Sequence, residues 1–308
     1  MDSPILYRSI LHLNPDNDPR RDRPQHAWIE NPYRVHQRIM WALDGTLPER
    51  DKDTGHRPGR DEESPLPLFR IFPESGRVLV QTATRPDWKK AFSNSQHEAR
   101  FLLDPNCDPD VIEYAPDITE GTTYPFQLLA NPSQKMIVPM PEGGWKAARL
   151  RLSKEELKLL RKQRKRIGVL KPQDIDEAKN IDEKLRVSWL ANRREERLLE
   201  WIQRHFEDSG FMPLPVATPG KSDSHGQERV AKVGIRVRDT FTVRAFKGHK
   251  SDNRPPEHKK PIDLHAAVFE GVLRVTNPEC ALKTIRHGIG PAKGLGFGLL
   301  LLGNQLEL

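Results

Sequence analysis

Tyr33 and His36 have the residue types and the spacing for proton-transfer chemistry. They stand three positions apart in the segment Tyr33-Arg-Val-His36, so on a helix both side chains project from one face. An imidazole can take or give a proton near neutral pH, and a phenol can orient a hydroxyl or a phosphate oxygen. The spacing alone leaves a structural alternative open, in which Tyr33 packs against a neighbour and His36 caps a polar group.

The segment from Gly288 to Gly298 is the second candidate, because it holds five glycines in eleven residues and one lysine, Lys293. Too little chain follows for the βαβ unit of a dinucleotide-binding loop, and the Gly-Lys-Ser/Thr of a Walker A loop is absent. The backbone N–H groups of Gly290 and Gly294 can lie against a phosphate. The alternative is a tight structural crossover that needs glycine for its backbone angles.

Two basic clusters carry charge suited to phosphate contacts. Five of the six positions from 161 to 166 are basic, in a segment with helical composition, although Glu155 and Glu156 allow an ordinary solvated face instead. The second cluster is a row of arginines that strict alternation places on one face of a strand at 232–246. The candidate phosphate-binding residues are Arg161, Lys162, Lys165, Arg166, Arg236, Arg238, Arg244, Lys293, Gly290 and Gly294.

The first 120 residues contain the elements that must position Tyr33 and His36. Asn31-Pro32 opens a helix, because Asn caps helix N-termini well and Pro suits the first helical position. Its apolar residues recur to Ala42, and Gly45 supplies the C-terminal cap. Strands are expected at 5–13 and, around the turn at 73–76, within 68–84, whereas 14–30 and 44–65 are expected to be loops. This order is that of a ferredoxin-like unit.

The remaining chain repeats the order at a wider spacing. Strands are predicted at 124–130, 232–246, 264–275 and 298–302, and a helix opened by Asn277-Pro278 runs to about His287. Residues 152–206 have helical composition, broken near 168–174. The sequence therefore predicts an α+β protein with two tandem ferredoxin-like (RRM-like) βαββαβ domains and antiparallel sheets. The domains are residues 1–120 and residues 121–308, and the second includes a helical insert at 144–197.

Composition excludes several classes of protein. The longest segment without a charged residue has 14 residues, whereas a spanning helix needs about 20, so an integral membrane protein is excluded. No secretory signal is expected, and two distant cysteines, Cys107 and Cys280, fit a reducing cytoplasm. Scattered histidines and aspartates predict neither a metal site nor a cofactor, and Asp104, Asp108 and Asp110 are assigned to a loop. The net charge of +7 hints only weakly at a polyanionic partner.

Three motifs give the chain a resemblance to a known family. His265-Ala-Ala-Val-Phe-Glu-Gly-Val-Leu, followed by the Gly288–Gly298 segment and Leu-Leu, resembles the CasE family, the CRISPR repeat-RNA endoribonucleases of the type I-E Cascade complex. Tyr33-Arg-Val-His36 matches the family's N-terminal Tyr-x-x-His, and Phe126-Gln-Leu-Leu-Ala-Asn-Pro132 is similar to its central strand. The matches cover about two-thirds of the chain, while the loops at 14–30 and 44–65 and the insert at 144–197 are longer than in compact members.

The resemblance implies a defined reaction on CRISPR repeat hairpins. A ribose 2′-hydroxyl attacks the adjacent phosphodiester without metal or cofactor and leaves a 2′,3′-cyclic phosphate and a 5′-hydroxyl. His36 would transfer a proton, Tyr33 would position the ribose or phosphate, and a cation would stabilise the transition state. Such enzymes keep the cut hairpin and join the other Cascade subunits. The alternatives are a non-catalytic RNA-binding subunit and a metal-dependent nuclease acting on DNA.

Overall fold

The computed structural model describes ten ranges of the chain, which fall into two compact units. The ranges are 5–15, 24–43, 65–93, 102–135, 166–167, 172–215, 217–222, 228–230, 234–246 and 261–303. The sheet unit contains Met1–Asn131 and Gln203–Leu308, and the helical unit contains Pro132–Ile202. Among the helices in these ranges, none has the length and apolar character needed to cross a membrane. Cys107 and Cys280 are free thiols.

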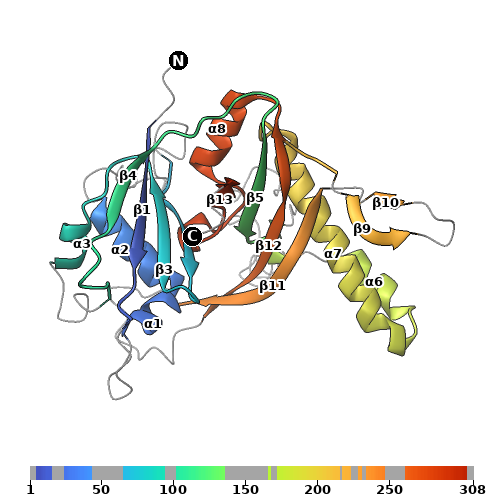
Figure 1. Ribbon diagram of the computed structural model, residues 1–308. Helices are drawn as coiled ribbons and strands as arrows, with labels where there is room; N and C mark the ends of the chain where they lie inside the picture. The colour runs from blue at the N-terminus through green and yellow to red at the C-terminus, as the bar shows by residue number, and fades with distance from the viewer. Residues whose placement is uncertain are drawn as a thin grey trace, which may run out of the picture. The chain divides into compact units, whose positions relative to one another are not determined.

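The first sheet of the sheet unit has the ferredoxin-like strand order. Its strands β1 (Leu6–His12), β2 (Leu68–Phe72), β3 (Arg77–Thr82) and β4 (Asp110–Tyr114) are arranged β2-β3-β1-β4, and every neighbouring pair is antiparallel. Helix α2 (Pro32–Ala42) connects β1 to β2, and α3 (Trp88–Ser93) connects β3 to β4 (Figure 1). The predicted hairpin is confirmed, with Gly76 in the left-handed region at φ +61°.

The second sheet repeats this order with the second half of the chain. Strands β5 (Thr123–Ala130), β11 (Ile235–Ala245), β12 (Ile262–Val275) and β13 (Leu300–Leu302) are arranged β11-β12-β5-β13, all antiparallel, and β8 (Phe211–Pro213) also pairs with β12. Helix α7 (Glu183–Glu207) precedes β11, and α8 (Pro278–His287) connects β12 to β13. The same topology occurs twice, so the tandem ferredoxin-like fold predicted from the sequence is confirmed. The boundary at residue 120 stays a prediction.

Both helices opened by Asn-Pro begin as the sequence predicts. The Asn31 side chain accepts a hydrogen bond from the Tyr33 N–H, and that of Asn277 accepts one from the Cys280 N–H. Val35 and Ile39 of α2 are fully buried in the core between α2 and the first sheet. Helix α2 ends at Leu43, and Gly45, which was expected to cap it, lies outside the described residues.

Three local expectations are wrong. Residues 14–30 are not all loop, because Pro24–Ile29 forms helix α1, whose Trp28 and Ile29 are buried in the first core and whose Trp28 ring meets Phe92 edge-on. Asp110 begins β4 instead of lying in a loop. Arg166 and Ile167 form strand β7, paired with β6 (Gln134–Lys135), within a segment expected to be helical. In each case, packing or strand pairing overrides local composition.

The two sheets meet through their faces that carry no helix. Leu68 and Leu79 of the first sheet pack against Leu299 and Leu301, on the segment that leads into β13. Beside this contact the buried Gln81 accepts two hydrogen bonds from Arg8, and its Nε2 donates to the Ile285 carbonyl of α8 at 2.8 Å. The two halves of the chain are thus joined by an apolar contact and by a hydrogen bond.

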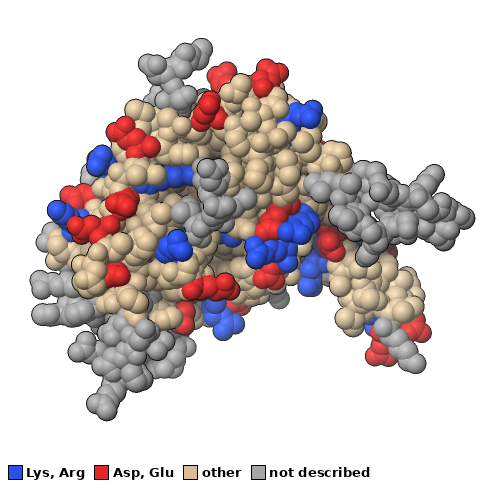
Figure 2. Space-filling view, in the orientation of Figure 1, with Lys and Arg blue, Asp and Glu red and all other residues tan. Residues whose placement is uncertain are grey.

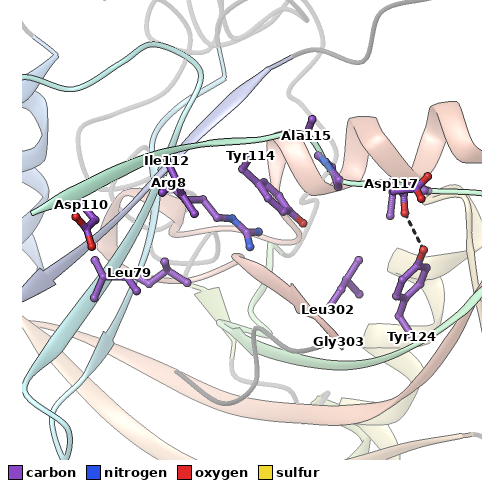
Figure 3. A pocket seen from close by; sticks show the side chains of 13 residues that line it. Arg8, Leu79, Asp110, Ile112, Tyr114, Ala115, Asp117, Tyr124, Leu302 and Gly303 are labelled. Carbon is purple, nitrogen blue, oxygen red and sulfur yellow. Dashed lines mark hydrogen bonds between the residues drawn. The ribbon is translucent and has the colours of Figure 1, made fainter.

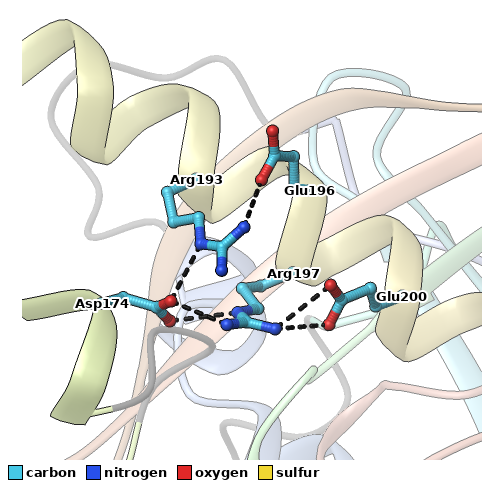
Figure 4. A network of polar contacts seen from close by, with 5 residues as sticks. All are labelled: Asp174, Arg193, Glu196, Arg197 and Glu200. Atoms are coloured by element: carbon cyan, nitrogen blue, oxygen red, sulfur yellow. Dashed lines mark hydrogen bonds and ion pairs between the residues drawn. The ribbon is translucent and has the colours of Figure 1, made fainter. Parts of the chain in front are cut away.

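In the helical unit, a buried carboxylate joins helix α6 (Pro172–Lys179) to helix α7. Asp174 of α6 is fully buried and accepts hydrogen bonds from Arg193 and Arg197 of α7 (Figure 4). Glu196 and Glu200 bind the outer edges of the same arginines. A small hairpin, β9 (Ala217–Ser222) with β10 (Glu228–Val230), follows α7 and belongs to the sheet unit.

We expect Asp174→Ala to loosen α6, because the change leaves two arginines without their buried partner. Removing one member of a buried ion pair costs about 3–5 kcal/mol. Amide hydrogen exchange of residues 172–179 should accelerate, and urea denaturation should show the loss of stability. Asp176→Ala, which breaks the exposed pair with Lys179, is the matched control and should cost less than about 1 kcal/mol. Equal effects of the two substitutions would contradict this account of the helical unit.

Candidate functional site

Tyr33 and His36 project from the first turns of α2 and are both half-buried. The Asn31-Pro32 start fixes their position, since it determines where the helix begins. Asn31 also binds the residue that follows β11: its Nδ2 donates to the Phe246 carbonyl, and its Oδ1 accepts from the Phe246 N–H. The pair predicted from the sequence therefore lies on one helical turn, held at its start by the second half of the chain.

The glycine-rich segment lies directly against His36. A methyl group at Gly294 would lie 3.3 Å from the Cε1 atom of His36, which is closer than most such contacts. Gly294 belongs to a short 3-10 helix, η3 (Lys293–Leu295), that contacts α2 and β2. The structure thus brings together the two candidate motifs from opposite ends of the sequence.

Other glycines of the segment allow the same close approach. Gly296 lies against the Phe69 ring, where a methyl group would stand 3.1 Å from Cε2. Gly288, at φ +68°, leaves no room for a side chain beside Leu68. Gly290 takes the left-handed conformation at φ +80°. The segment is therefore a tight crossover, as the structural alternative proposed, and it also places Lys293 in the turn that meets the His36 helix.

The prediction that three arginines lie in a row on one face of a strand is wrong. A β-bulge in β11 places Val237 opposite Phe269 and Asp239 opposite Val268, so Arg238 is an extra residue and the alternation reverses after it. Arg236 and Arg238 share a face with Glu270 of β12, whereas Arg244 lies on the other face and pairs with Asp263 at 2.9 Å. The alternation of the sequence gave no sign of the bulge.

Glu270 organises the face that holds Arg236 and Arg238. It accepts hydrogen bonds from both arginines at 2.9 Å and one from Gln127 Nε2 at 2.6 Å. Burial alone would raise the pKa of Glu270, but these hydrogen bonds outweigh it, so the pKa lies below its ordinary value. Both arginines remain exposed, and Figure 2 shows basic and acidic side chains interleaved over β11 and β12.

Arg70 of β2 is a candidate that the sequence patterns did not identify. It is only 8% exposed, and its Nη1 is buried without a hydrogen bond in the described ranges. The pKa of Arg70 is lowered to about 10, chiefly by burial and also by the charge of Arg238, while Glu270 acts in the opposite sense. The signal was present in Leu68-Phe-Arg-Ile-Phe72, where one cation interrupts an apolar strand.

A cavity of about 670 Å³ opens beside Arg8 and Tyr114 (Figure 3). The Arg8 guanidinium is buried, lies 3.5 Å from the centre of the Tyr114 ring, and has its pKa lowered to about 10 by burial. Across the cavity, the Tyr124 hydroxyl donates to the Asp117 carbonyl at 2.7 Å. No residue of the predicted site lines this cavity.

The remaining predicted residues cannot be placed as a group. Arg161, Lys162 and Lys165 lie outside the described residues, and Arg166 lies in β7, so the basic helix is not observed. Within the described ranges, no three His, Cys, Asp or Glu side chains gather in a way that could hold a metal ion.

Comparison with known proteins agrees with the fold. A model of the family described as CRISPR associated protein matches residues 6–303. The CRISPR-associated endoribonuclease Cse3 of Thermus thermophilus is 29% identical over 301 residues, which cover 96% of this chain and 98% of that protein. A structure of CRISPR endoribonuclease Cse3 bound to 19 nt RNA has a TM-score of 0.57 at 22% identity, covering 97% of this chain and 99% of that one. The structure of Thermus thermophilus Cse3 bound to an RNA representing a pre-cleavage complex has a TM-score of 0.55 at 22% identity. The match covers 97% of this chain and 98% of that one.

We expect Gly294→Ala to disturb the His36 side chain while leaving the fold intact. The backbone at Gly294 is not in the left-handed region, so alanine adds only the contact with the imidazole. The His36 ring resonances in an NMR spectrum should shift, with the melting temperature changed by no more than a few degrees. Gly121→Ala is the control for the resonances, because nothing lies within 4 Å of a methyl group there. Unchanged His36 resonances in the Gly294 variant would contradict the contact.

Proposed function

Because this chain belongs to the CRISPR-associated protein family, as its resemblance to CasE predicted, we propose that it is a metal-independent endoribonuclease that cuts CRISPR repeat hairpins. The match spans almost the whole chain, and the relative Cse3 is named an endoribonuclease. We further propose that the protein acts in the cytoplasm, keeps the cut hairpin and serves as a subunit of a Cascade complex.

The proposed reaction is an internal transesterification. The ribose 2′-oxygen forms a bond to the adjacent phosphorus while the bond from phosphorus to the 5′-oxygen breaks. The 2′-hydroxyl gives up its proton, and the departing 5′-oxygen receives one. The products are a 2′,3′-cyclic phosphate and a 5′-hydroxyl, and no water is consumed in this step.

His36 transfers one of these protons in the proposed mechanism. General acid-base help of this kind contributes about 10²–10⁴-fold in rate. Tyr33, from the same face of α2, orients the ribose or the phosphate. Lys293 stabilises the charge that develops on the phosphoryl oxygens. The observation that carries the proposal is the contact between Gly294 and the His36 imidazole, which places a lysine-bearing turn beside a histidine.

The RNA-binding residues follow from the faces of the sheets. Arg236 and Arg238 share the face on which the second sheet meets the first, so we propose that they contact the RNA backbone. Gly290 and Gly294 offer backbone N–H groups in the crossover. The basic residues Arg161, Lys162, Lys165 and Arg166 stay predicted contacts, as does Arg244 on the opposite face. The two domains are proposed as residues 1–120 and 121–308.

We expect His36→Ala to bind the repeat hairpin normally but to cut it at least about 10²-fold more slowly, because a proton-transfer group is lost. Single-turnover cleavage and filter binding measure the two quantities. Gln37→Ala, an exposed neighbour on α2, is the control and should keep the wild-type rate. Equal cutting by the His36 variant would exclude His36 as the proton-transfer group, and absence of cutting by the wild-type protein would favour a non-catalytic RNA-binding subunit.

The nature of the nucleophile is tested with the same hairpin carrying a 2′-deoxy nucleotide at the cut position. We expect the wild-type protein to leave this substrate intact and to cut the unmodified RNA in EDTA. Cleavage of the deoxy substrate would rule out attack by the 2′-hydroxyl. Loss of cleavage in EDTA would point to a metal-dependent nuclease.

We expect Arg236→Ala and Arg238→Ala each to weaken hairpin binding several-fold and to flatten its dependence on salt, because each loses a phosphate contact. Arg244→Ala removes the same charge from the other face of the same strand, so it should weaken binding less. Titrations of labelled hairpin at several salt concentrations measure the difference. Three equal losses would show that the RNA does not distinguish the two faces.

A further inference from the structure

Arg70 is expected to lower the stability of the fold, because its charge is buried. Its side chain is more than nine-tenths buried, and its Nη1 makes no hydrogen bond within the described part of the chain. Its guanidinium lies over the Phe72 ring, whose centre is 5.0 Å away. A buried charge without a full set of partners destabilises a protein, and an apolar side chain of similar size at such a place is often neutral or stabilising.

The surroundings of Arg70 are suited to an anion. The alternation of β2 places Arg70 on the same face as Leu68, which packs against Leu299 and Leu301 of the second half of the chain. Arg238 and Glu270, from β11 and β12, lie within electrostatic reach of Arg70. With Arg236, the group holds three cations around the Glu270 carboxylate, and the carboxylates of Glu74 and Asp239 also act on Arg238.

Glu270 leaves part of each exposed arginine available. Arg238 donates to it through Nη1 only, and Arg236 through Nε and Nη2. A guanidinium has five N–H donors, so each arginine is fixed along one edge and can bind a phosphate with another. Gln127, on neighbouring β5, holds the carboxylate in place from the opposite side.

We propose that Arg70, Arg236 and Arg238 form a binding site for one backbone phosphate of the RNA, with Glu270 as the positioning residue. Arg70 is held in place by burial and contacts the phosphate from the sheet. Arg236 and Arg238, which are exposed, contact it from the solvent side. This inference rests on the proposed function, since it names where the RNA backbone crosses the face between the sheets. It does not involve the proton transfer at His36.

Arg70→Met separates binding from structure. We expect about a ten-fold loss of affinity for the repeat hairpin and a salt dependence shallower by about one phosphate contact. The melting temperature should stay equal or rise, because a buried cation is replaced by an apolar side chain. Arg85→Met, at an exposed arginine in the turn before α3, is the control and should change neither affinity nor salt dependence.

Arg238→Met keeps the proposal testable if the Arg70 variant folds poorly, since Arg238 is exposed. It should weaken binding and flatten the salt dependence in the same way, and the double variant should lose less than the product of the two single losses, because both arginines bind one phosphate. An Arg70 variant that melts earlier and keeps the wild-type salt dependence would show a structural role. Independent losses in the double variant would show that Arg70 and Arg238 do not bind the same phosphate, and would overturn the proposal. A wild-type protein that binds no repeat hairpin would instead overturn the proposed function.

Discussion

The close approach of the C-terminal crossover to α2 and β2 is the constraint on which the site depends. Gly294 meets His36, Gly296 meets Phe69, and Gly288 meets Leu68 at distances that leave little or no room for a Cβ atom. Two of these glycines also adopt positive φ, which other residues reach only with strain. Side chains at Gly288 and Gly296 would push the crossover away from β2, and the lysine-bearing turn would then leave the histidine-bearing helix. These glycines are therefore needed because any larger side chain would collide with the residues that the crossover contacts.

The repeated strand order explains why the crossover arrives there. In each half, the last strand pairs with the first, so β13 lies beside β5. The segment between α8 and β13 packs Phe297 against Leu264 and Ala266 of β12, and so lies on the face of the second sheet that carries no helix. Leu299 and Leu301 then fill the contact with Leu68 and Leu79. A ferredoxin-like sheet has one face without helices, and pairing two such sheets lets each cover part of the other. The site lies where this pairing meets helix α2.

Much of this arrangement could be predicted because it is encoded locally. The Asn-Pro helix starts, the alternation in β12 and the order of elements each depend on a few neighbouring residues, and the Tyr33–His36 pair needs only one helical turn. The failures depend on distant partners. The bulge in β11 exists only in its register against β12, and it moves Arg244 to the opposite face. Helix α1 forms where Trp28 packs against Phe92. The polar sequence around Trp28 gives no indication of this distant contact.

The face between the sheets combines apolar packing with buried cations, and this combination argues for a role beyond stability. Arg8 and Arg70 lie on either side of the β3 strand that carries Leu79, and burial lowers the pKa of each to about 10. Arg8 is held by Gln81 and stacks on Tyr114, so its cost is partly offset. In the described part of the chain, Arg70 Nη1 has no such hydrogen-bond partner, and a leucine or methionine could fill the same space. A fold selected for stability alone would favour the apolar residue. Retention of the cation is understandable if the anion that completes its hydrogen bonds arrives with the RNA.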